Sequence, residues 1–243
     1  MTLVLDERRV AMLEQFGIRW HAPNDIAASP ESAPAEYAAP EKVATVPKIE
    51  LAPRATGIEA MHWDQLAETV AACRACKLCA TRRNTVFGVG DMQADWLIVG
   101  EAPGENEDMQ GEPFVGQAGK LLDNMLRSLG LSRREKVYIA NVLKCRPPGN
   151  RNPEPDEVAQ CEPFLRRQVE LLQPKVIIAM GRFAVQSLLG TTDAIGKLRG
   201  QRHQYSGVPV VVTYHPAYLL RNLPDKAKAW ADLCLARSIV SQG

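Results

Sequence analysis

The sequence lacks any run of about eighteen apolar residues, the length that a membrane-spanning helix requires. Its N-terminus also lacks the basic start and the long apolar core of a secretory leader. The net charge is only +1, so charge by itself does not identify a nucleic-acid partner. With 46% apolar residues the chain can build a core, and we expect a globular, monomeric protein of the cytoplasm with no membrane association.

The first 57 residues differ in composition from the rest of the chain. Residues 3–20 have the pattern of a short helix, whereas residues 22–56 are rich in Pro and Ala and show no hydrophobic period. Such a composition cannot bury enough apolar surface to order itself. We therefore expect residues 1–57 to form a short N-terminal helix and a disordered linker. Residues 58–243 should form the main domain, whose slight excess of basic residues permits a DNA partner without identifying one.

Apolar runs alternate with helical patterns throughout the main domain. Near-continuous apolar strands separated by helices are typical of a mostly parallel sheet with helices on both faces. The sequence therefore predicts an α/β fold, a three-layer α/β/α sandwich with a mostly parallel, four-stranded central sheet. The expected strands are residues 95–100, 137–141, 175–180 and 208–213, and the expected helices lie near residues 60–72, 117–129, 154–172, 182–189 and 225–240.

Several residues support these helix boundaries. Asn152 can cap a helix whose first residue is Pro153, because its side chain can accept from the free N–H groups of the first turn and proline has no N–H to lose there. Gly130 and Gly190 follow predicted helix ends, where a left-handed residue is favoured. The sequence thus marks the start of one helix and the ends of two others.

Three of the four predicted strands lead into residues with reactive or hydrogen-bonding side chains. Glu101 follows the first strand, Asn141 ends the second and His215 follows the fourth. Because ligands bind beyond the carboxyl ends of the strands in such sheets, we expect these residues to meet in one cleft. Each also has a structural explanation when taken alone. Glu101 can cap a turn, Asn141 can satisfy backbone groups at a strand end, and His215 can be an ordinary turn residue before a proline.

An aromatic residue in a loop adds to this set. Phe114 lies in the segment Gly111–Gly116, between glycine and proline residues, and an aromatic side chain is more often part of a core than of a binding site. A loop aromatic can, however, stack on a flat nucleobase while an Asn side chain binds the edge of that base. Phe114 and Asn141 together therefore point to a nucleobase as ligand.

Six cysteines occur in a chain without signs of export, so structural disulfides are not expected. Cys73, Cys76 and Cys79 are spaced as CxxCxxC, with Cys145 and Cys161 further along the chain. These thiols suffice for a four-sulfur site that could hold zinc or an iron–sulfur cluster. The alternative is that they are unrelated buried cysteines.

Four ordered motifs, together with the cysteines, resemble the family 4 uracil-DNA glycosylases, the iron–sulfur branch. The resemblance covers about residues 60–240, and its motifs are Gly100–Glu105, Gly111–Gly116, Asn141–Pro148 and His215–Arg221. It implies the uracil-DNA glycosylase fold and a DNA repair enzyme of base excision. Such an enzyme flips uracil out of single- or double-stranded DNA and hydrolyses its N-glycosidic bond, which releases uracil and leaves an abasic site.

The resemblance also implies a [4Fe-4S] cluster held by Cys73, Cys76, Cys145 and Cys161. Cys79 and Cys234 would then be spare thiols, although Cys79 could replace Cys73, because Cys76 and Cys79 form an equally good CxxC pair. Zinc remains the alternative metal. Since hydrolysis has no redox step, we expect the cluster to hold loops in place.

The resemblance implies roles for individual residues of the cleft. His215 would stabilise the charge that develops on uracil O2, and Glu101 would act on the water or on the cationic sugar, so these two are the candidate catalytic residues. Ala102 stands where better-known uracil glycosylases have an Asp, which leaves the water-activating group unidentified. Phe114 would stack on uracil, Asn141 would pair with its Watson–Crick edge, and Glu107 would close the C5 side against thymine. The uracil-binding residues are therefore Gly100, Glu101, Ala102, Glu107, Phe114, Asn141 and His215.

The segment after His215 would contact DNA. By superfamily resemblance an apolar side chain, which we assign to Leu219, fills the gap left by the flipped base, and Arg221 binds phosphate. Further phosphate contacts would come from basic residues, although scattered surface cations explain each of them equally well. These are Lys144, Arg146, Arg151, Arg199 and Arg202.

Two other functions are compatible with parts of the sequence. One superfamily branch bonds covalently to uracil-containing DNA through a histidine on an inserted basic loop, but residues 146–152 contain neither a histidine nor an insertion. The other is a non-enzymatic iron–sulfur accessory that binds DNA. In either case residues 1–57 could tether a repair or replication protein, although nothing in them names one.

Overall fold

The computed structural model describes residues 51–242, so most of the predicted N-terminal helix and linker lies outside the described residues. Residues 51–57 precede a short 3₁₀ helix, η1 (Ile58–Ala60). Two hydrogen bonds attach this segment to the main domain. The N–H of Ala52 donates to the carbonyl of Arg74 at 3.1 Å, and the guanidinium of Arg54 donates to the carbonyl of Ala159 at 3.2 Å.

Six strands form one sheet in the order β1-β3-β2-β4-β6-β5. The strands are β1 (Val89–Gly90), β2 (Trp96–Gly100), β3 (Val137–Asn141), β4 (Val176–Met180), β5 (Arg202–Tyr205) and β6 (Val208–Thr213). The four predicted strands are confirmed as the parallel centre of the sheet. The predicted number of four is wrong, because β1 and β5 add an antiparallel strand at each edge.

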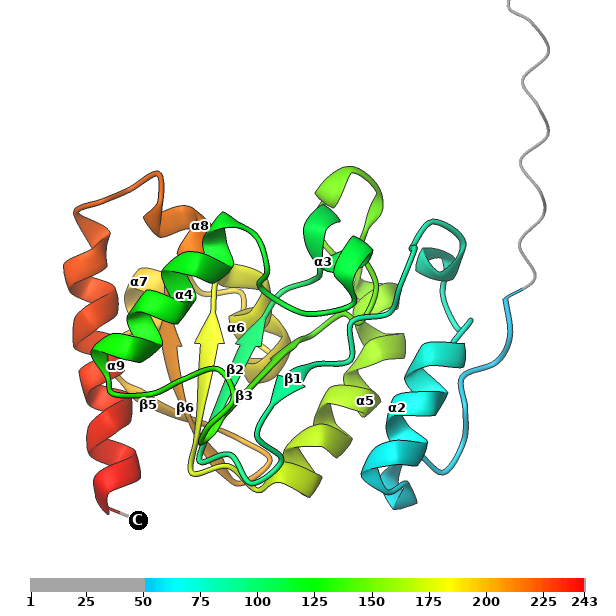
Figure 1. Cartoon of the computed structure of the whole chain (residues 1–243), viewed down its shortest axis with the longest axis horizontal. Coiled ribbons are helices and arrows are strands. Elements are labelled where there is room, and N and C mark those ends of the chain that lie inside the picture. The colour runs from blue at the N-terminus through cyan, green and yellow to red at the C-terminus, as the bar shows by residue number, and fades with distance from the viewer. Residues whose placement is uncertain (1–50, 243) are drawn as a thin grey trace, which may run out of the picture. The chain divides into compact units, whose positions relative to one another are not determined.

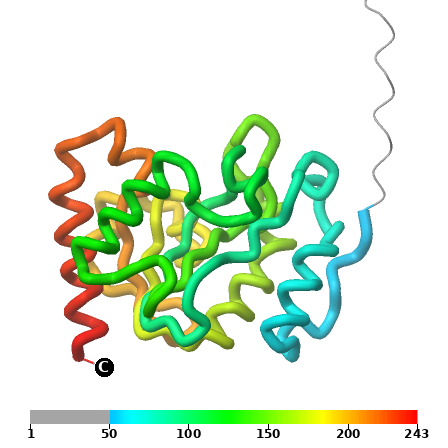
Figure 2. Tube along the Cα trace, viewed as in Figure 1, coloured from blue at the N-terminus to red at the C-terminus, as the bar shows by residue number. Residues whose placement is uncertain are grey.

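Helices cover both faces of the sheet, as predicted (Figures 1 and 2). Leu97 and Val99 of β2 face a core built with α5 and α6, whereas Trp96 and Ile98 face the opposite core, built with α4 and α9. Alternate residues of a strand point to opposite faces, so a strand buried on both faces must be apolar throughout. The helices are α2 (Trp63–Ala72), α3 (Glu105–Gln110), α4 (Gln117–Ser128), α5 (Pro155–Leu172), α6 (Arg182–Leu189), α7 (Ile195–Leu198), α8 (Pro216–Leu219) and α9 (Asp225–Gln242).

Two further 3₁₀ turns, η2 (Lys77–Ala80) and η3 (Pro148–Asn150), complete the secondary structure. The helix α2 lies beside α5, where Leu66 and Val70 pack on Phe164. Of the helices in residues 51–242, none is both long and apolar enough to cross a membrane.

The start of α5 corrects one predicted helix boundary. The cap is Glu154 and the first residue is Pro155, not Asn152 and Pro153. The Glu157 carboxylate accepts from the N–H of Glu154 at 2.9 Å, which satisfies a donor of the first turn. Two acidic residues in that turn also interact favourably with the helix dipole. The predicted left-handed glycines are confirmed, with φ of 76° at Gly130 and 61° at Gly190.

Candidate active site

A cavity of about 510 Å³ opens at the carboxyl ends of the parallel strands. Its lining joins residues that lie far apart in the sequence, because the ends of β2, β3 and β6 meet at this edge of the sheet. The predicted site residues that line it are Glu101, Ala102, Glu107, Phe114, Asn141, His215 and Arg221.

Gly100 lies beneath two of these side chains. A Cβ atom at this position would stand 2.4 Å from Asn141 Oδ1 and 2.6 Å from Phe114 Cζ. Real Cβ atoms do not approach other atoms so closely, so glycine is required for Asn141 and Phe114 to occupy their places.

The Asn141 side chain presents an unused acceptor. Asn141 is 2% exposed, at the end of β3. Within residues 51–242 no donor lies in hydrogen-bond reach of its Oδ1 atom. Because buried polar atoms are nearly always paired, this oxygen calls for a donor from a ligand.

Glu107 joins two loops of the site. Its Oε2 accepts from the N–H of Gly104 at 3.1 Å, and its Oε1 accepts from Val115 at 2.9 Å and from Gly116 at 3.2 Å. Its carboxylate thus holds the loop after β2 against the loop that carries Phe114. The ring of Phe114 in turn lies 5.4 Å from the ring of His215, at an interplanar angle of 28°.

His215 is a neutral donor in this environment. Its Nδ1 accepts from the N–H of Ala217 at 3.1 Å, so the neutral ring carries its proton on Nε2. Burial lowers the pKa of His215 to about 4, and the positive charge of Arg221 acts in the same direction. Gly181 makes room for the ring, since a Cβ there would lie 3.0 Å from the Cβ of His215.

Glu101 has the opposite shift. Burial raises the pKa of its carboxyl to about 7, while the nearby Arg182 partly offsets the effect. The side chain is half-buried, on the loop after β2. Near neutral pH this carboxyl can therefore exist in either protonation state, which is the range in which acid–base groups work best.

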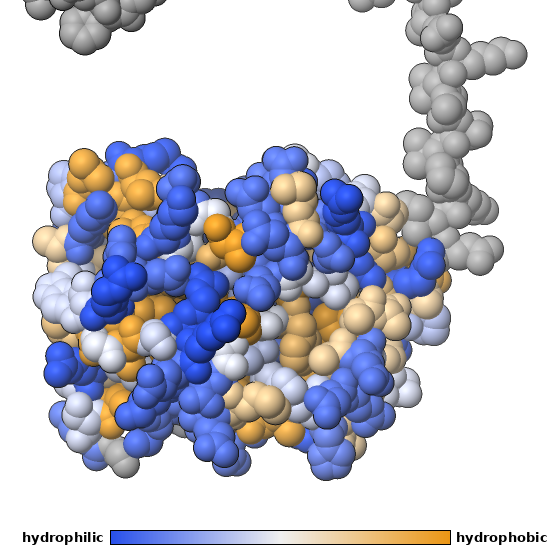
Figure 3. Space-filling model, viewed as in Figure 1, coloured by the Kyte–Doolittle hydropathy of each residue, from blue (hydrophilic) through white to orange (hydrophobic). Residues whose placement is uncertain are grey.

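The segment after His215 differs from the prediction at one residue. Leu219 is 1% exposed and lies in a groove between α4 and α9, so its side chain does not reach the surface. Successive residues of a helical turn point in different directions. Leu220 is 43% exposed and Leu223 is 60% exposed, and apolar atoms of this loop are visible at the upper left of Figure 3.

Two predicted phosphate contacts are occupied elsewhere. Lys144 is 1% exposed, and its ammonium donates to the carbonyl of Asn141 at 2.9 Å and to the side chain of Gln168 at 2.6 Å. Arg199 forms two hydrogen bonds with the buried carboxylate of Asp232, at 2.9 and 3.1 Å. Burial and pairing of a charged side chain depend on tertiary contacts, which the sequence did not reveal.

Other residues of the cavity were missed. Tyr218 lies within the motif that carries His215, and its hydroxyl donates to Asp225 at 2.6 Å. Arg151 lines the opposite side and donates to Glu157. Its neighbours Asn150 and Asn152 line the cavity as well. Membership of the motif could have indicated Tyr218, but no pattern in the sequence marks the two asparagines.

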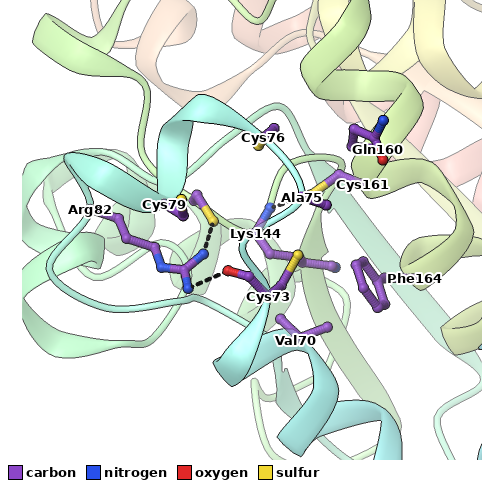
Figure 4. Close-up of a pocket in the computed structure, with 11 residues that line it drawn as sticks. Val70, Cys73, Ala75, Cys76, Cys79, Arg82, Lys144, Gln160, Cys161 and Phe164 are labelled. Carbon is purple, nitrogen blue, oxygen red and sulfur yellow. Dashed lines mark hydrogen bonds between the residues drawn. The ribbon is translucent and has the colours of Figure 1, made fainter. Parts of the chain in front are cut away.

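Five cysteines line a second, enclosed pocket, which Figure 4 shows at the end of α2 and beside α5. The guanidinium of Arg82 donates to Cys145 Sγ at 2.9 Å, and the N–H of Lys144 donates to Cys161 Sγ at 3.4 Å. Burial raises the pKa of Cys145 to about 11 and that of Cys161 to about 12. The five are Cys73, Cys76, Cys79, Cys145 and Cys161.

Comparison with known proteins gives consistent similarities. Residues 87–234 match the family model of the uracil DNA glycosylase superfamily. A type-4 uracil-DNA glycosylase of Archaeoglobus fulgidus is 48% identical over 165 residues, which are 65% of this chain and 82% of the relative. The corresponding protein of Thermotoga maritima is 48% identical over 181 residues, 73% of this chain and 94% of the relative. A type-5 uracil-DNA glycosylase of Pyrobaculum aerophilum is 35% identical over 147 residues, 54% of this chain and 64% of the relative.

Proposed function

The chain belongs to the uracil DNA glycosylase superfamily and to its type-4 enzymes, and we propose that the cavity at the carboxyl ends of β2, β3 and β6 is its active site. The chain is a uracil-DNA glycosylase, a DNA repair hydrolase that excises uracil from DNA. The proposal that follows concerns which residues perform this reaction. The observation that carries it is the buried Asn141 Oδ1, which lacks a donor among residues 51–242.

Asn141 reads the flipped base. Uracil presents a donor at N3 and an acceptor at O4, so the Asn141 amide accepts from N3–H and donates to O4. Cytosine presents an acceptor and then a donor at the same places, which leaves both groups of the amide unpaired. Each buried group without a partner costs about 1–3 kcal/mol, enough to reject cytosine by a large factor.

Phe114 and Glu107 shape the rest of the base site. The ring of Phe114 stacks on uracil, next to the ring of His215. Glu107 lines the cavity while its carboxylate holds the Phe114 loop, and it closes the side on which thymine carries its methyl group. A Glu107→Ala variant should therefore tolerate thymine better than the wild type.

His215 stabilises the leaving base. Cleavage of the N-glycosidic bond moves electrons onto uracil, and the Nε2–H of the neutral imidazole donates to O2 as negative charge develops there. A preorganised donor of this kind contributes roughly 3–4 kcal/mol, so His215→Ala should slow the reaction about a hundred- to a thousandfold. A loss below threefold would remove His215 from the mechanism.

Glu101 acts on the other side of the bond. As the sugar becomes electron-poor, an ionised carboxylate at Glu101 stabilises the positive charge and orients the water that adds to it. Ala102, beside it in the cavity, has no group that can take a proton. We therefore assign the electrostatic role to Glu101.

The DNA contact involves the loop after α8. Arg221 lines the rim of the cavity and binds phosphate. Leu220 replaces Leu219 as the apolar residue that fills the gap left by the flipped base, because Leu220 is exposed and Leu219 is not.

We assign a [4Fe-4S] cluster to Cys73, Cys76, Cys145 and Cys161, with which the donor set fits. The thiols line one pocket, and burial makes them weak acids whose deprotonation requires the positive charge of a metal. No group of three His, Cys, Asp or Glu side chains in the described residues could hold a single ion, which favours a larger cluster over zinc. When bound, the cluster supplies iron–thiolate bonds that tie the end of α2 to α5 and to the segment after β3.

The test is uracil release from labelled single-stranded and duplex oligonucleotides that carry one uracil, with matched thymine controls. Alkali then cuts any abasic site. The proposal expects cleavage at uracil alone and its loss in Asn141→Ala. Binding without release would favour the accessory function, and a stable protein–DNA adduct would favour the covalent branch. A monomeric enzyme of the cytoplasm, with residues 1–57 as a tether for a repair or replication protein, stays a prediction.

A further inference from the structure

Phe114 adopts a backbone conformation that needs support. Its φ is 55°, in the left-handed region that residues other than glycine rarely adopt. It lies between α3 and α4, in a segment that is neither helix nor strand. Backbone strain of this kind persists only where the surrounding contacts fix it, and it gathers at functional sites. The question is which residues fix Phe114.

Arg133 supplies much of that support from a distant part of the chain. Its Nη1 donates to the carbonyl of Pro113 at 2.9 Å and its Nη2 donates to the carbonyl of Phe114 at 2.8 Å. A planar guanidinium can bind two neighbouring carbonyls in this way, whereas an ammonium can reach only one well. Arg133 lies between α4 and β3, and its side chain is 19% exposed, so these bonds are largely shielded from water.

Asp123 orients the arginine. Its Oδ1 accepts from Arg133 Nε at 3.0 Å and lies 2.9 Å from Arg133 Nη2. The carboxylate is on α4, so it fixes the guanidinium relative to the first helix after the Phe114 loop. Four nitrogen–oxygen contacts therefore determine where Arg133 points.

Two further contacts leave the Phe114 carbonyl little freedom. A Cβ at Gly119 would lie 1.7 Å from this oxygen, so the carbonyl is pressed against the start of α4. On the other side, Glu107 accepts from the N–H groups of Val115 and Gly116. Arg133 thus holds the peptide carbonyl of Phe114 while Glu107 holds the amides that follow it.

We propose that Arg133 is a positioning residue that sets the Phe114 ring as the stacking surface for the flipped uracil, with Asp123 as the group that orients it. The lining of the cavity, as far as residues 51–242 form it, does not include Arg133, so Arg133 acts through Phe114. This inference rests on the proposed stacking role of Phe114. Loss of Arg133 disturbs binding of the base but not binding of the DNA backbone.

The experiment uses the full-length protein carrying Arg133→Ala, Arg133→Lys or Asp123→Asn, with Arg127→Ala as the matched control. Arg127 is an exposed arginine of α4 whose side chain bonds only to Asn124 among the described residues. Three quantities are measured: the single-turnover rate of uracil release, inhibition by free uracil, and affinity for DNA with an abasic site. Thermal unfolding and the visible spectrum verify that each variant is folded.

We expect Arg133→Ala to slow release roughly 10–100-fold, because small misplacements of binding groups have effects of this size. Inhibition by free uracil should weaken in parallel, while affinity for abasic DNA stays within about twofold, since the phosphate contacts are untouched. Guanidinium ion at millimolar concentration should restore part of the rate of Arg133→Ala but not that of Phe114→Ala. If Arg133→Ala does not fold, Arg133→Lys should show the same pattern to a smaller degree.

The double variant Phe114→Ala/Arg133→Ala separates this inference from the proposal on which it rests. If Phe114→Ala itself leaves uracil inhibition unchanged, the stacking role is wrong. If Phe114→Ala weakens inhibition but Arg133→Ala and Arg133→Lys behave like Arg127→Ala, only the positioning role is wrong. Effects of the two substitutions that multiply in the double variant would also contradict it, because residues acting through one ring cannot be independent.

Discussion

Gly100 and Asn141 are opposite each other in the parallel pair β2–β3, and a Cβ at Gly100 would stand 2.4 Å from Asn141 Oδ1. The same Cβ would stand 2.6 Å from the ring of Phe114. One missing methyl group thus makes space for both side chains that are proposed to hold uracil. The uracil site depends on the backbone of β2 as much as on the residues that touch the base.

Gly100→Ala should abolish most activity without unfolding the protein. The new methyl group displaces the Asn141 amide and the Phe114 ring, and a displacement of about 1 Å can cost about a hundredfold in rate. Single-turnover release of uracil is the measurement, and Gly196→Ala is the control, because a Cβ there meets no atom within 4 Å in the described chain. A rate for Gly100→Ala within threefold of wild type would refute the packing argument.

The pH dependence of kcat/KM should report Glu101. The pKa of its carboxyl is about 7 in the folded protein, so the ionised form grows as pH rises through 7, and kcat/KM should rise with it. His215 cannot cause this limb, since its pKa of about 4 keeps it neutral throughout. Glu101→Gln should be slow and lack the limb near 7. Survival of that limb in Glu101→Gln would assign it to another group.

The same shift affects stability. Because the folded pKa of Glu101 lies above its ordinary value of 4.5, the folded state binds this proton more tightly than the unfolded chain does. Stability contributed by the protonated carboxyl is therefore lost as pH rises from about 4.5 through 7. Glu101→Gln should raise Tm at pH 8, by about 2–4 °C for each kcal/mol recovered, but not at pH 4.5. Thermal unfolding at the two pH values checks this.

The cysteines can be sorted by spectrum and iron content. Serine substitution of Cys73, Cys76, Cys145 or Cys161 should remove the visible absorption and most of the iron, and should lower Tm, because the cluster ties several segments together. Cys79→Ser should keep both. If Cys79→Ser loses the cluster and Cys73→Ser retains it, Cys79 is the fourth ligand. A colourless protein that contains stoichiometric zinc would contradict the cluster altogether.

The two neighbouring leucines should behave differently. Leu219→Ala removes a buried side chain and should destabilise the protein by about 2–5 kcal/mol. Leu220→Ala removes an exposed side chain and should leave stability nearly unchanged, yet slow uracil release from duplex DNA more than from single strands, where no partner base must be separated. Denaturant unfolding and release assays on both substrates test this. A stable, active Leu219→Ala variant together with an unaffected Leu220→Ala variant would contradict the assignment.

The centre of the fold was predictable, but its edges were not. The strands β2, β3, β4 and β6 are nearly continuous apolar runs, because both of their faces are buried. The edge strand β5 is polar and partly exposed, so no apolar run marks it. The start of α5 was ambiguous for a local reason, since Asn152-Pro153 and Glu154-Pro155 both resemble a cap followed by proline.

The site was predictable only as far as motifs reached. Glu101, Phe114, Asn141 and His215 belong to motifs and are brought together in one cavity. Arg133 was missed because the carbonyls it binds lie about twenty residues earlier in the chain, and their need for support comes from a backbone angle that the sequence does not reveal.

The most direct test of the account compares two methylated forms of free uracil as inhibitors of uracil release. If Asn141 Oδ1, which has no donor within the described part of the chain, accepts from N3–H, 1-methyluracil should inhibit. 3-Methyluracil, which lacks that hydrogen, should then inhibit at least about tenfold more weakly, because it leaves a buried acceptor unpaired. The difference should disappear in Asn141→Ala. Equal inhibition of the wild-type enzyme by the two compounds would contradict the assignment of Asn141 as the residue that reads the base.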